Sequence, residues 1–345
     1  MANIMLTDVC NLKCPYCFAN EFVNHDANEI SLENFHKALD FITKDGCDHV
    51  GLIGGEPLLH SRIREILQWI IADERIQSAV IYTNGIKAKE LALELSNPKF
   101  RLLVNCNPIE DMSEPLFKKM IDSLDELIFN RSMKQHITLG INFYKENQDY
   151  QYILDLLKHY GLNRVRMSVT VPNLQAQKNK DPLSYFRHMK FLILRFIEDC
   201  LEEGILPFYD CNKIPVCVWE KEELQKLEYL TKDLEDQALN QANSIVSHDA
   251  LCNPVIDILQ DLQVVRCFGL SDVSKQSIND FKTLSDLNNY YIHQFDMPAF
   301  HTSANVQCQG CKEKETLHCL GGCISYKLQQ IITLKRALAS TNYVK

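Results

Sequence analysis

The sequence has no long apolar run, no excess of basic residues and no internal repeat. Its N-terminus, MANIMLTDVCNLKC, lacks the basic and apolar segments that make up a secretory signal peptide. No apolar run reaches the roughly 20 residues that a membrane-spanning helix needs. The net charge of −9 leaves no basic surface of the kind that binds nucleic acid. These absences predict a cytoplasmic protein with neither a membrane nor a nucleic-acid partner.

Cysteine, by contrast, is abundant, with 14 in 345 residues. A protein of a reducing compartment does not usually keep its cysteines as disulfides. Cys47, Cys106 and Cys200 stand alone in or beside apolar segments, where a thiol behaves as a small buried apolar group. The other cysteines gather in two regions of the chain. Clustered thiols in such a protein indicate metal ligands.

Short apolar runs alternate with amphipathic stretches up to about residue 205. The predicted strands are Ala2–Thr7, His49–Ile53, Ser78–Tyr82, Phe100–Asn105, His136–Asn142 and Arg164–Val169. A first helix is expected between Ser31, a predicted N-cap, and Gly46, a predicted end. The other predicted helices span about 62–72, 87–95, 114–128, 150–160 and 182–203.

This alternation predicts a parallel sheet with right-handed connections. Six strand–helix units are fewer than the eight of a closed barrel, so we expect an α/β fold, a partial (β/α)6 TIM-like barrel. Its active site should lie at the C-terminal ends of the strands. The pattern changes after Gly204. We therefore expect residues 1–205 to form the barrel and residues 206–345 a small Cys-rich α+β domain, with a hairpin made by 255–259 and 263–267.

The first cysteine group, Cys10, Cys14 and Cys17, directly follows the first predicted strand. Three thiols on one loop can ligate three irons of a cubane and leave the fourth iron open. A structural zinc site would need a fourth ligand, for which only His25 lies near in the sequence. A redox pair at Cys14 and Cys17 would leave Cys10 without a role.

Two motifs resemble the radical S-adenosylmethionine (radical SAM) superfamily. CNLKCPYCFAN resembles its CxxxCxxC signature, and Gly54-Gly55-Glu56-Pro57, at the end of the second predicted strand, resembles its GGEP element. The resemblance implies that Cys10, Cys14 and Cys17 hold a [4Fe–4S] cluster whose open iron is chelated by SAM. It also implies one-electron cleavage of SAM to a 5′-deoxyadenosyl radical, which abstracts hydrogen from a substrate.

The same resemblance implies a set of SAM contacts. Gly54 and Gly55 would let the backbone approach the cofactor, and Glu56 would help to hold its ammonium group. Tyr16 resembles the family residue that touches adenine. The remaining candidates lie at or near the ends of the third to sixth strands: Thr83, Asn84, Asn105, Asn142 and Ser168. No catalytic acid or base is assigned.

The second cysteine group lies beyond residue 205. Its members are Cys211, Cys217, Cys252, Cys267, Cys308, Cys311, Cys319 and Cys323. The group resembles the SPASM or twitch extension of radical SAM enzymes that modify peptides, such as RiPP maturases and anaerobic sulfatase maturases. The resemblance implies one or two auxiliary iron–sulfur clusters.

The spacing of this group departs from the family pattern. Its last four members read Cx2Cx7Cx3C, with seven residues in the middle gap where the family usually has five. No further cysteine follows Cys323, which leaves the usual second auxiliary cluster open. A zinc site at the last four cysteines is the alternative. The assignment of thiols to clusters stays open at this point.

Three functions follow from these patterns. The leading hypothesis is an enzyme that modifies a peptide or protein by crosslinking, thioether formation or oxidation, using SAM and an electron donor such as a flavodoxin or ferredoxin. The second is a radical SAM dehydrogenase or related enzyme that acts on a small molecule, which a single auxiliary cluster would favour. The third is an iron–sulfur or zinc module without catalysis, against which the Gly54–Pro57 element argues.

Overall fold

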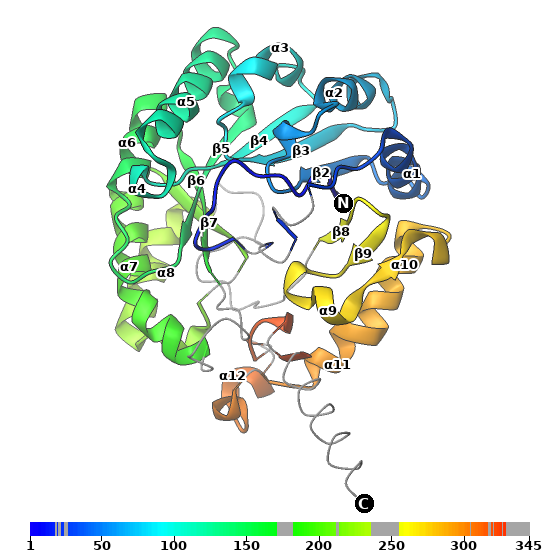
Figure 1. The fold of residues 1–345 in the computed structure, drawn as a ribbon. Coiled ribbons are helices and arrows are strands. Elements are labelled where there is room, and N and C mark those ends of the chain that lie inside the picture. Colours follow the sequence, from blue (N-terminus) through cyan, green and yellow to red (C-terminus); the bar gives the residue numbers. More distant parts are fainter. Residues whose placement is uncertain are drawn as a thin grey trace, which may run out of the picture.

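The centre of the protein is a single ten-stranded sheet with helices around its outer face (Figure 1). The computed structural model describes residues 1–17, 19, 22–23, 27–170, 182–211, 214–235, 255–303, 305–316, 319, 321–325 and 327–328. The strand order is β10-β9-β8-β1-β2-β3-β4-β5-β6-β7. All neighbours from β8 to β7 in this order are parallel. The sheet curves but does not close, which confirms the predicted partial barrel (Figure 1).

The elements have the following bounds. The strands are β1 (Ala2–Met5), β2 (His49–Ile53), β3 (Ser78–Thr83), β4 (Phe100–Asn105), β5 (Ile137–Phe143), β6 (Arg164–Val169), β7 (Leu206–Cys211), β8 (Ile256–Ile258), β9 (Gln263–Val265) and β10 (Gln276–Ser277). The helices are α1 (Leu32–Thr43), α2 (Ile63–Ala72), α3 (Ala92–Leu95), α4 (Ile109–Met112), α5 (Glu114–Asp125), α6 (Gln151–Tyr160), α7 (Pro182–Glu202), α8 (Lys221–Glu235), α9 (Ser271–Ser274), α10 (Leu284–Tyr291), α11 (Met297–Phe300) and α12 (Lys312–Glu315).

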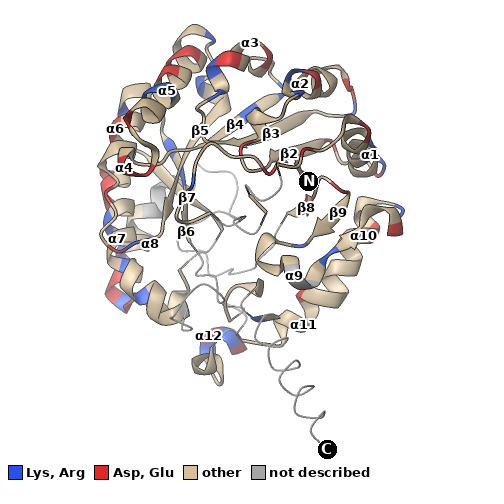
Figure 2. Cartoon of the chain, viewed as in Figure 1, with Lys and Arg blue, Asp and Glu red and all other residues tan. Residues whose placement is uncertain are grey.

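The core lies between the sheet and its helices. In α1, for example, Phe35, Leu39 and Ile42 are buried at helical spacing. Ser31 caps this helix, because its Oγ accepts a hydrogen bond from the Asn34 amide at 3.1 Å. Charged residues gather on the outer helices, away from the sheet (Figure 2). None of the helices in the described ranges is long and apolar enough to cross a membrane.

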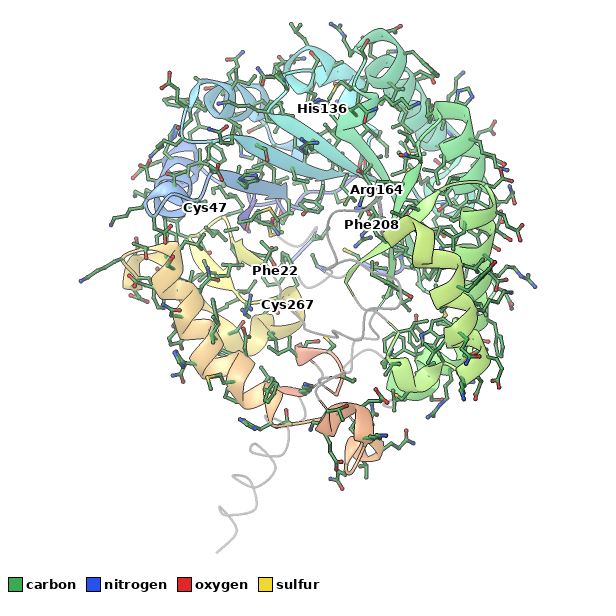
Figure 3. All side chains as sticks on the ribbon, turned by 180° about the vertical axis from the view of Figure 1, so that it is seen from behind. Phe22, Cys47, His136, Arg164, Phe208 and Cys267 are labelled. Carbon is green, nitrogen blue, oxygen red and sulfur yellow. The ribbon has the colours of Figure 1, made fainter. Side chains whose placement is uncertain are left out.

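The six predicted strands are present, each within two residues of its expected ends. The count of six parallel strands was too low. Leu206–Cys211, where the sequence shows no clear period, forms β7 and pairs in parallel with β6. Pro207 interrupts its pattern, and proline is tolerated here because β7 is the last strand of the sheet. In Figure 3 Arg164 of β6 lies beside Phe208 of β7, with its guanidinium carbon 5.0 Å from the ring centroid.

A strand from the C-terminal part completes the other side of the barrel. The predicted hairpin is present as β8 and β9, which pair antiparallel. Its first strand also pairs in parallel with β1, with Ala2 opposite Ile256 and Asn3 opposite Asp257. The sheet therefore continues across the boundary that the sequence places near residue 205. The division into two domains stays a prediction.

A buried polar contact joins these two strands. Asn3 Nδ2 donates to Asp257 Oδ1 at 2.8 Å, and Asp257 is only 6% exposed. The Asn3 amide lies over Gly51 of β2, where a Cβ atom would come within 1.9 Å of Asn3 Oδ1. Glycine at position 51 thus makes room for the side chain that joins β1 to β8.

We predict that Asp257 makes stability depend on pH. Burial raises the pKa of Asp257 to about 7 from an ordinary value of 3.8, although Asn3 and Arg266 oppose the shift. Between these pH values the native state holds a proton that the unfolded chain has released. The contribution of Asp257 to the free energy of unfolding should therefore fall as pH rises from about 4 to about 7.

Denaturant unfolding at a series of pH values tests this expectation. Asp257→Asn keeps an oxygen that can accept from Asn3 and should remove this part of the pH dependence. Asp261→Asn, at the exposed turn of the same hairpin, is the control and should leave the dependence as in the wild type. A constant difference between wild type and Asp257→Asn across the range would contradict the assignment.

Candidate functional site

Cys10, Cys14 and Cys17 lie on one loop, the Cys loop, which follows β1 at its C-terminal end. The loop starts at a bridge between Thr7 and Glu29 and is half-buried at all three cysteines. The Leu12 amide donates to Cys10 Sγ at 3.5 Å, and the Cys17 amide donates to Cys14 O at 3.1 Å. This loop therefore presents its thiols at the end of the sheet where the sequence places the active site.

The end of β2 holds the start of this loop. Gly55 N donates to Thr7 O and Glu56 N donates to Val9 O, both at 2.8 Å. A Cβ atom at Gly54 would lie 2.6 Å from Thr7 O, and one at Gly55 would lie 2.4 Å from Val9 O. In this structure both glycines thus allow a close approach to residues 7–9 of the chain itself. Their expected contact with SAM stays a prediction.

Glu56 ties the end of β2 to the end of β3. Its side chain is 1% exposed, and its oxygens accept from Leu58 N at 3.1 Å, Thr83 Oγ1 at 2.7 Å and Asn84 N at 2.7 Å. Burial nevertheless raises the pKa of Glu56 to about 7. Asn84 Nδ2 in turn donates to Asn11 Oδ1 of the Cys loop at 2.7 Å. These hydrogen bonds therefore connect the ends of β2 and β3 to the Cys loop through Glu56, Thr83 and Asn84.

A cluster of hydrogen-bonded polar side chains, the Asn142 cluster, lies at the ends of β4, β5 and β6. Asn142 is its centre, because its Oδ1 accepts from Arg166 Nη1 and from Ser168 Oγ, both at 2.6 Å. Its Nδ2 donates to Asn105 Oδ1 at 3.4 Å. The structure thus brings together Asn105, Asn142 and Ser168, the three residues that the sequence analysis assigned to this region.

Tyr16 is hydrogen-bonded to the residue that holds Cys14. Its hydroxyl donates to Asn107 Oδ1, and Asn107 Nδ2 donates to Cys14 Sγ at 3.2 Å. The ring of Tyr16 packs on that of Tyr144, with centroids 5.5 Å apart. Tyr144 hydroxyl donates to Asp111 Oδ2 at 2.6 Å. The aromatic residue inside the motif is therefore linked to Cys14 through Asn107.

Sequence reasoning missed Arg166 and Asn107. Arg166 alternates with the buried residues Val165 and Met167 on β6, and this alternation was the available signal. Gly140 on β5 lets the Arg166 side chain pass, since a Cβ there would lie 3.3 Å from Arg166 Cδ. Asn107 follows β4 by two residues and carries no motif of its own.

The three thiols are protonated in the absence of a metal. Burial raises the pKa of Cys10 to about 12 and also raises the pKa of Cys14 and Cys17. The Asn107 amide opposes this shift at Cys14. A thiolate at these positions therefore requires the positive charge of bound iron. Three half-buried thiols on one loop, with a hydrogen-bond donor to one of them, have the chemistry of the cluster that the motif implies.

The Cys loop also packs against the C-terminal hairpin. The rings of Phe22 and Phe268 lie 5.4 Å apart, and both belong to a cluster that includes Cys17 and Val265. Figure 3 shows Phe22 beside Cys267, which directly precedes Phe268. Cys267 of the second cysteine group therefore lies near the Cys loop.

Most of the second cysteine group lies within the described residues. Cys267 and Cys323 border the contact of Gly269 with Ser325, and Cys308, Cys311 and Cys319 lie around α12. Cys217 lies on a 3-10 turn (Val216–Val218) after β7. Cys211 ends β7, whereas Cys252, His25 and His318 lie outside the described residues. No three His, Cys, Asp or Glu side chains in the described ranges have the spacing of a single metal ion site.

We predict that Gly55→Ala displaces the Cys loop. Its Cβ would collide with backbone at Val9 and Asp8, which cannot rotate away as a side chain would. The variant should lose the iron that Cys10, Cys14 and Cys17 bind after anaerobic reconstitution, measured as iron per chain.

Gly46→Ala is the matched control. Gly46 has φ +86° and open space around its Cβ position, so alanine costs only backbone strain of about 1–2 kcal/mol. This variant should lower the thermal midpoint and keep its iron. Equal iron in both variants would show that the contact at Gly55 does not position the loop.

Comparison with known proteins connects this geometry to a family. The profile of the radical SAM superfamily matches residues 4–146. A GTP 3′,8-cyclase of Clostridium perfringens is 29% identical over 162 residues, which cover 45% of this chain and 49% of that relative. A probable GTP 3′,8-cyclase of Methanococcus aeolicus is 30% identical over 217 residues, 61% of this chain and 64% of the relative. The chain spans about half the length of the first of these curated relatives.

Solved structures show the same fold over most of the chain. SuiB of Streptococcus suis bound to S-adenosylmethionine covers 93% of this chain and 72% of its own, with a TM-score of 0.58 and 18% identity. SuiB bound to its precursor peptide SuiA gives the same TM-score and identity. At this identity the likeness concerns the fold. The family profile covers the strands and the loop that carry Cys10, Cys14, Cys17 and the Gly54–Pro57 element. The chain therefore contains a radical SAM domain.

Proposed function

We propose that this protein is a radical SAM enzyme that abstracts hydrogen from a peptide or protein and so modifies it after translation. The modification would be a crosslink, a thioether or an oxidation. The observation that carries the proposal is that the loop with the three thiols, Tyr16 and the Asn142 cluster all lie at one end of the barrel. This is the end at which enzymes with parallel barrels bind their substrates.

In this proposal Cys10, Cys14 and Cys17 hold the [4Fe–4S] cluster, and SAM binds its open iron. When bound, the cluster and SAM supply one-electron cleavage to a 5′-deoxyadenosyl radical, with the electron coming from a donor such as a flavodoxin or ferredoxin. The Asn107 amide would hold the Cys14 sulfur through its hydrogen bond. Glu56 would help to position the Cys loop, because its carboxylate oxygens accept hydrogen bonds from Leu58, Thr83 and Asn84 of the chain itself.

The Asn142 cluster would orient SAM. Asn105, Asn142 and Ser168 offer neutral donors and acceptors that suit a ribose, and Arg166 offers a cation that suits a carboxylate. Tyr16 and Tyr144 form a pair of packed rings that suits adenine. The residues of the cluster lie on strands, which hold side chains more rigidly than free loops do.

The choice of substrate class depends on the C-terminal part. The fold likeness to SuiB extends over 93% of this chain, and one of its structures contains a precursor peptide. The match to GTP 3′,8-cyclases supports a second candidate, a radical reaction on a small molecule such as a nucleotide. We favour the peptide because the fold likeness to SuiB extends over 93% of this chain, whereas the match to the Methanococcus aeolicus relative covers 61% of it.

The radical step has a direct test. We predict that a variant with Cys10→Ala, Cys14→Ala and Cys17→Ala forms no 5′-deoxyadenosine from SAM under anaerobic dithionite, as measured by liquid chromatography. Cys47→Ala removes a half-exposed thiol at the start of β2 and should keep the wild-type rate. Cleavage that persists in the triple variant would refute the site.

The substrate class has a separate test. A low-mass fraction of cell extract should stimulate 5′-deoxyadenosine formation, and prior digestion of the fraction with protease should abolish the stimulation. GTP is the matched probe for the second candidate. Stimulation that survives protease, or stimulation by GTP alone, would replace the peptide proposal with the small-molecule one.

A further inference from the structure

The side-chain amide of Asn107 donates a hydrogen bond to the second thiol of the Cys loop. Asn107 follows β4 by two residues and is only 2% exposed. Its Nδ2 lies 3.2 Å from Cys14 Sγ. Cys10 Sγ accepts from a backbone amide instead, that of Leu12 at 3.5 Å. The donor to Cys14 is therefore set by the sequence, and a single substitution can remove it.

The backbone on both sides of Asn107 is held in place. Cys106 N donates to Gly140 O of β5 at 2.9 Å, and the Tyr152 hydroxyl donates to Cys106 O at 2.8 Å. Pro108 follows with φ −66° and leads into α4, and its ring restricts the backbone at this point. The Asn107 amide is therefore held against the end of the sheet and does not depend on a free loop for its position.

The hydroxyl of Tyr16 determines which end of the Asn107 amide faces the sulfur. It donates to Asn107 Oδ1, which leaves Nδ2 to face Cys14. A thiolate that binds iron has no proton to donate, so only the N–H end of an amide can bond to it. Tyr16 is itself packed on Tyr144, with ring centroids 5.5 Å apart. The hydrogen bonds therefore run in one direction, from Tyr16 through Asn107 to Cys14.

A donor to a ligating sulfur affects the two oxidation states of an iron–sulfur cluster unequally. Reduction adds an electron, part of whose charge falls on the sulfurs, so a hydrogen bond to a sulfur is stronger in the reduced state. Hydrogen bonds to the sulfurs are accordingly among the factors that set the reduction potential of such clusters. Asn107 and Tyr16 are neutral, so they stabilise this charge without adding a charge of their own.

We propose that Asn107 is a positioning residue that raises the reduction potential of the cluster at the Cys loop through its hydrogen bond to Cys14. Tyr16 contributes through its hydroxyl, which orients the Asn107 amide, and this role is separate from any contact of its ring with SAM. The inference rests on the proposed function, because it requires the thiols of the Cys loop to hold the cluster. It adds that a residue outside both motifs determines how readily the cluster accepts its electron.

Two substitutions at Asn107 test this role. Asn107→Leu nearly keeps the shape of the side chain and removes the donor. Asn107→Asp keeps an oxygen for the Tyr16 hydroxyl and puts a carboxylate oxygen in the place of Nδ2. Asn97→Leu, on the turn directly before β4, is the matched control, because Asn97 bonds to Lys99 N and not to the Cys loop.

The measurement is a redox titration followed by electron paramagnetic resonance. Each protein is reconstituted anaerobically with iron and sulfide and is titrated without SAM. The triple variant Cys10→Ala, Cys14→Ala, Cys17→Ala provides the background, so the signal that it lacks belongs to the cluster at the Cys loop.

We expect Asn107→Leu to make the potential of this signal more negative, by about tenfold in the reduction equilibrium, which is about 59 mV for one electron. Asn107→Asp should shift it in the same direction, and Asn97→Leu should match the wild type. An unchanged or less negative potential in both Asn107 variants would overturn the proposal. Loss of the signal from both would also overturn it, because Asn107 would then be needed to assemble the cluster and not to set its potential.

Tyr16→Phe tests the orientation of the amide separately. It keeps the ring and removes the hydroxyl, so we expect a shift in the same direction as in Asn107→Leu but smaller. A potential equal to that of the wild type would overturn the role of Tyr16. Failure of the proposed site has a different result, because the wild type would then show no signal that depends on the three cysteines of the Cys loop. Failure of this inference alone leaves that signal in place with an unchanged potential.

Discussion

The position of the Cys loop depends on backbone contacts between the end of β2 and the residues that precede Cys10. Gly55 N and Glu56 N bond to Thr7 O and Val9 O, so the first thiol of the motif follows directly on a fixed segment. The contact is so close that no side chain fits at positions 54 and 55. Glu56 then carries the restraint to Thr83 and Asn84 at the end of β3. The ends of three neighbouring strands thus determine where the Cys loop lies.

The second constraint is that the sheet is extended by the C-terminal part of the chain. β8 lies against β1 in parallel, and the buried pair Asn3–Asp257 joins them. Phe22 and Phe268 add an apolar contact between the Cys loop and the segment after β9. The Cys loop is therefore held from one side by β2 and from the other by the segment after the hairpin.

The sequence alone predicts the elements that depend on local residue patterns. Alternating apolar residues located six strands, and Ser31 has the capping role that its position predicts. It missed what depends on contacts between distant segments. β7 was missed because Pro207 breaks the strand pattern, and the parallel pairing of β8 with β1 joins residues about 250 positions apart. The position of Arg166 beside Asn142 depends on the pairing of β6 with β5, which the sequence of β6 alone does not reveal.

The relatives found by sequence and by fold differ in what their names mention, GTP for the cyclases and a precursor peptide for SuiB. The family profile ends at residue 146, before β6 begins. Arg166 and Ser168, the turn with Cys217 and the segment around α12 all lie beyond that point. The profile therefore covers the strands that carry the Cys loop and its hydrogen-bond partners on β2 and β3. For this reason the match to the family supports the radical SAM domain and does not decide between the two proposed substrate classes.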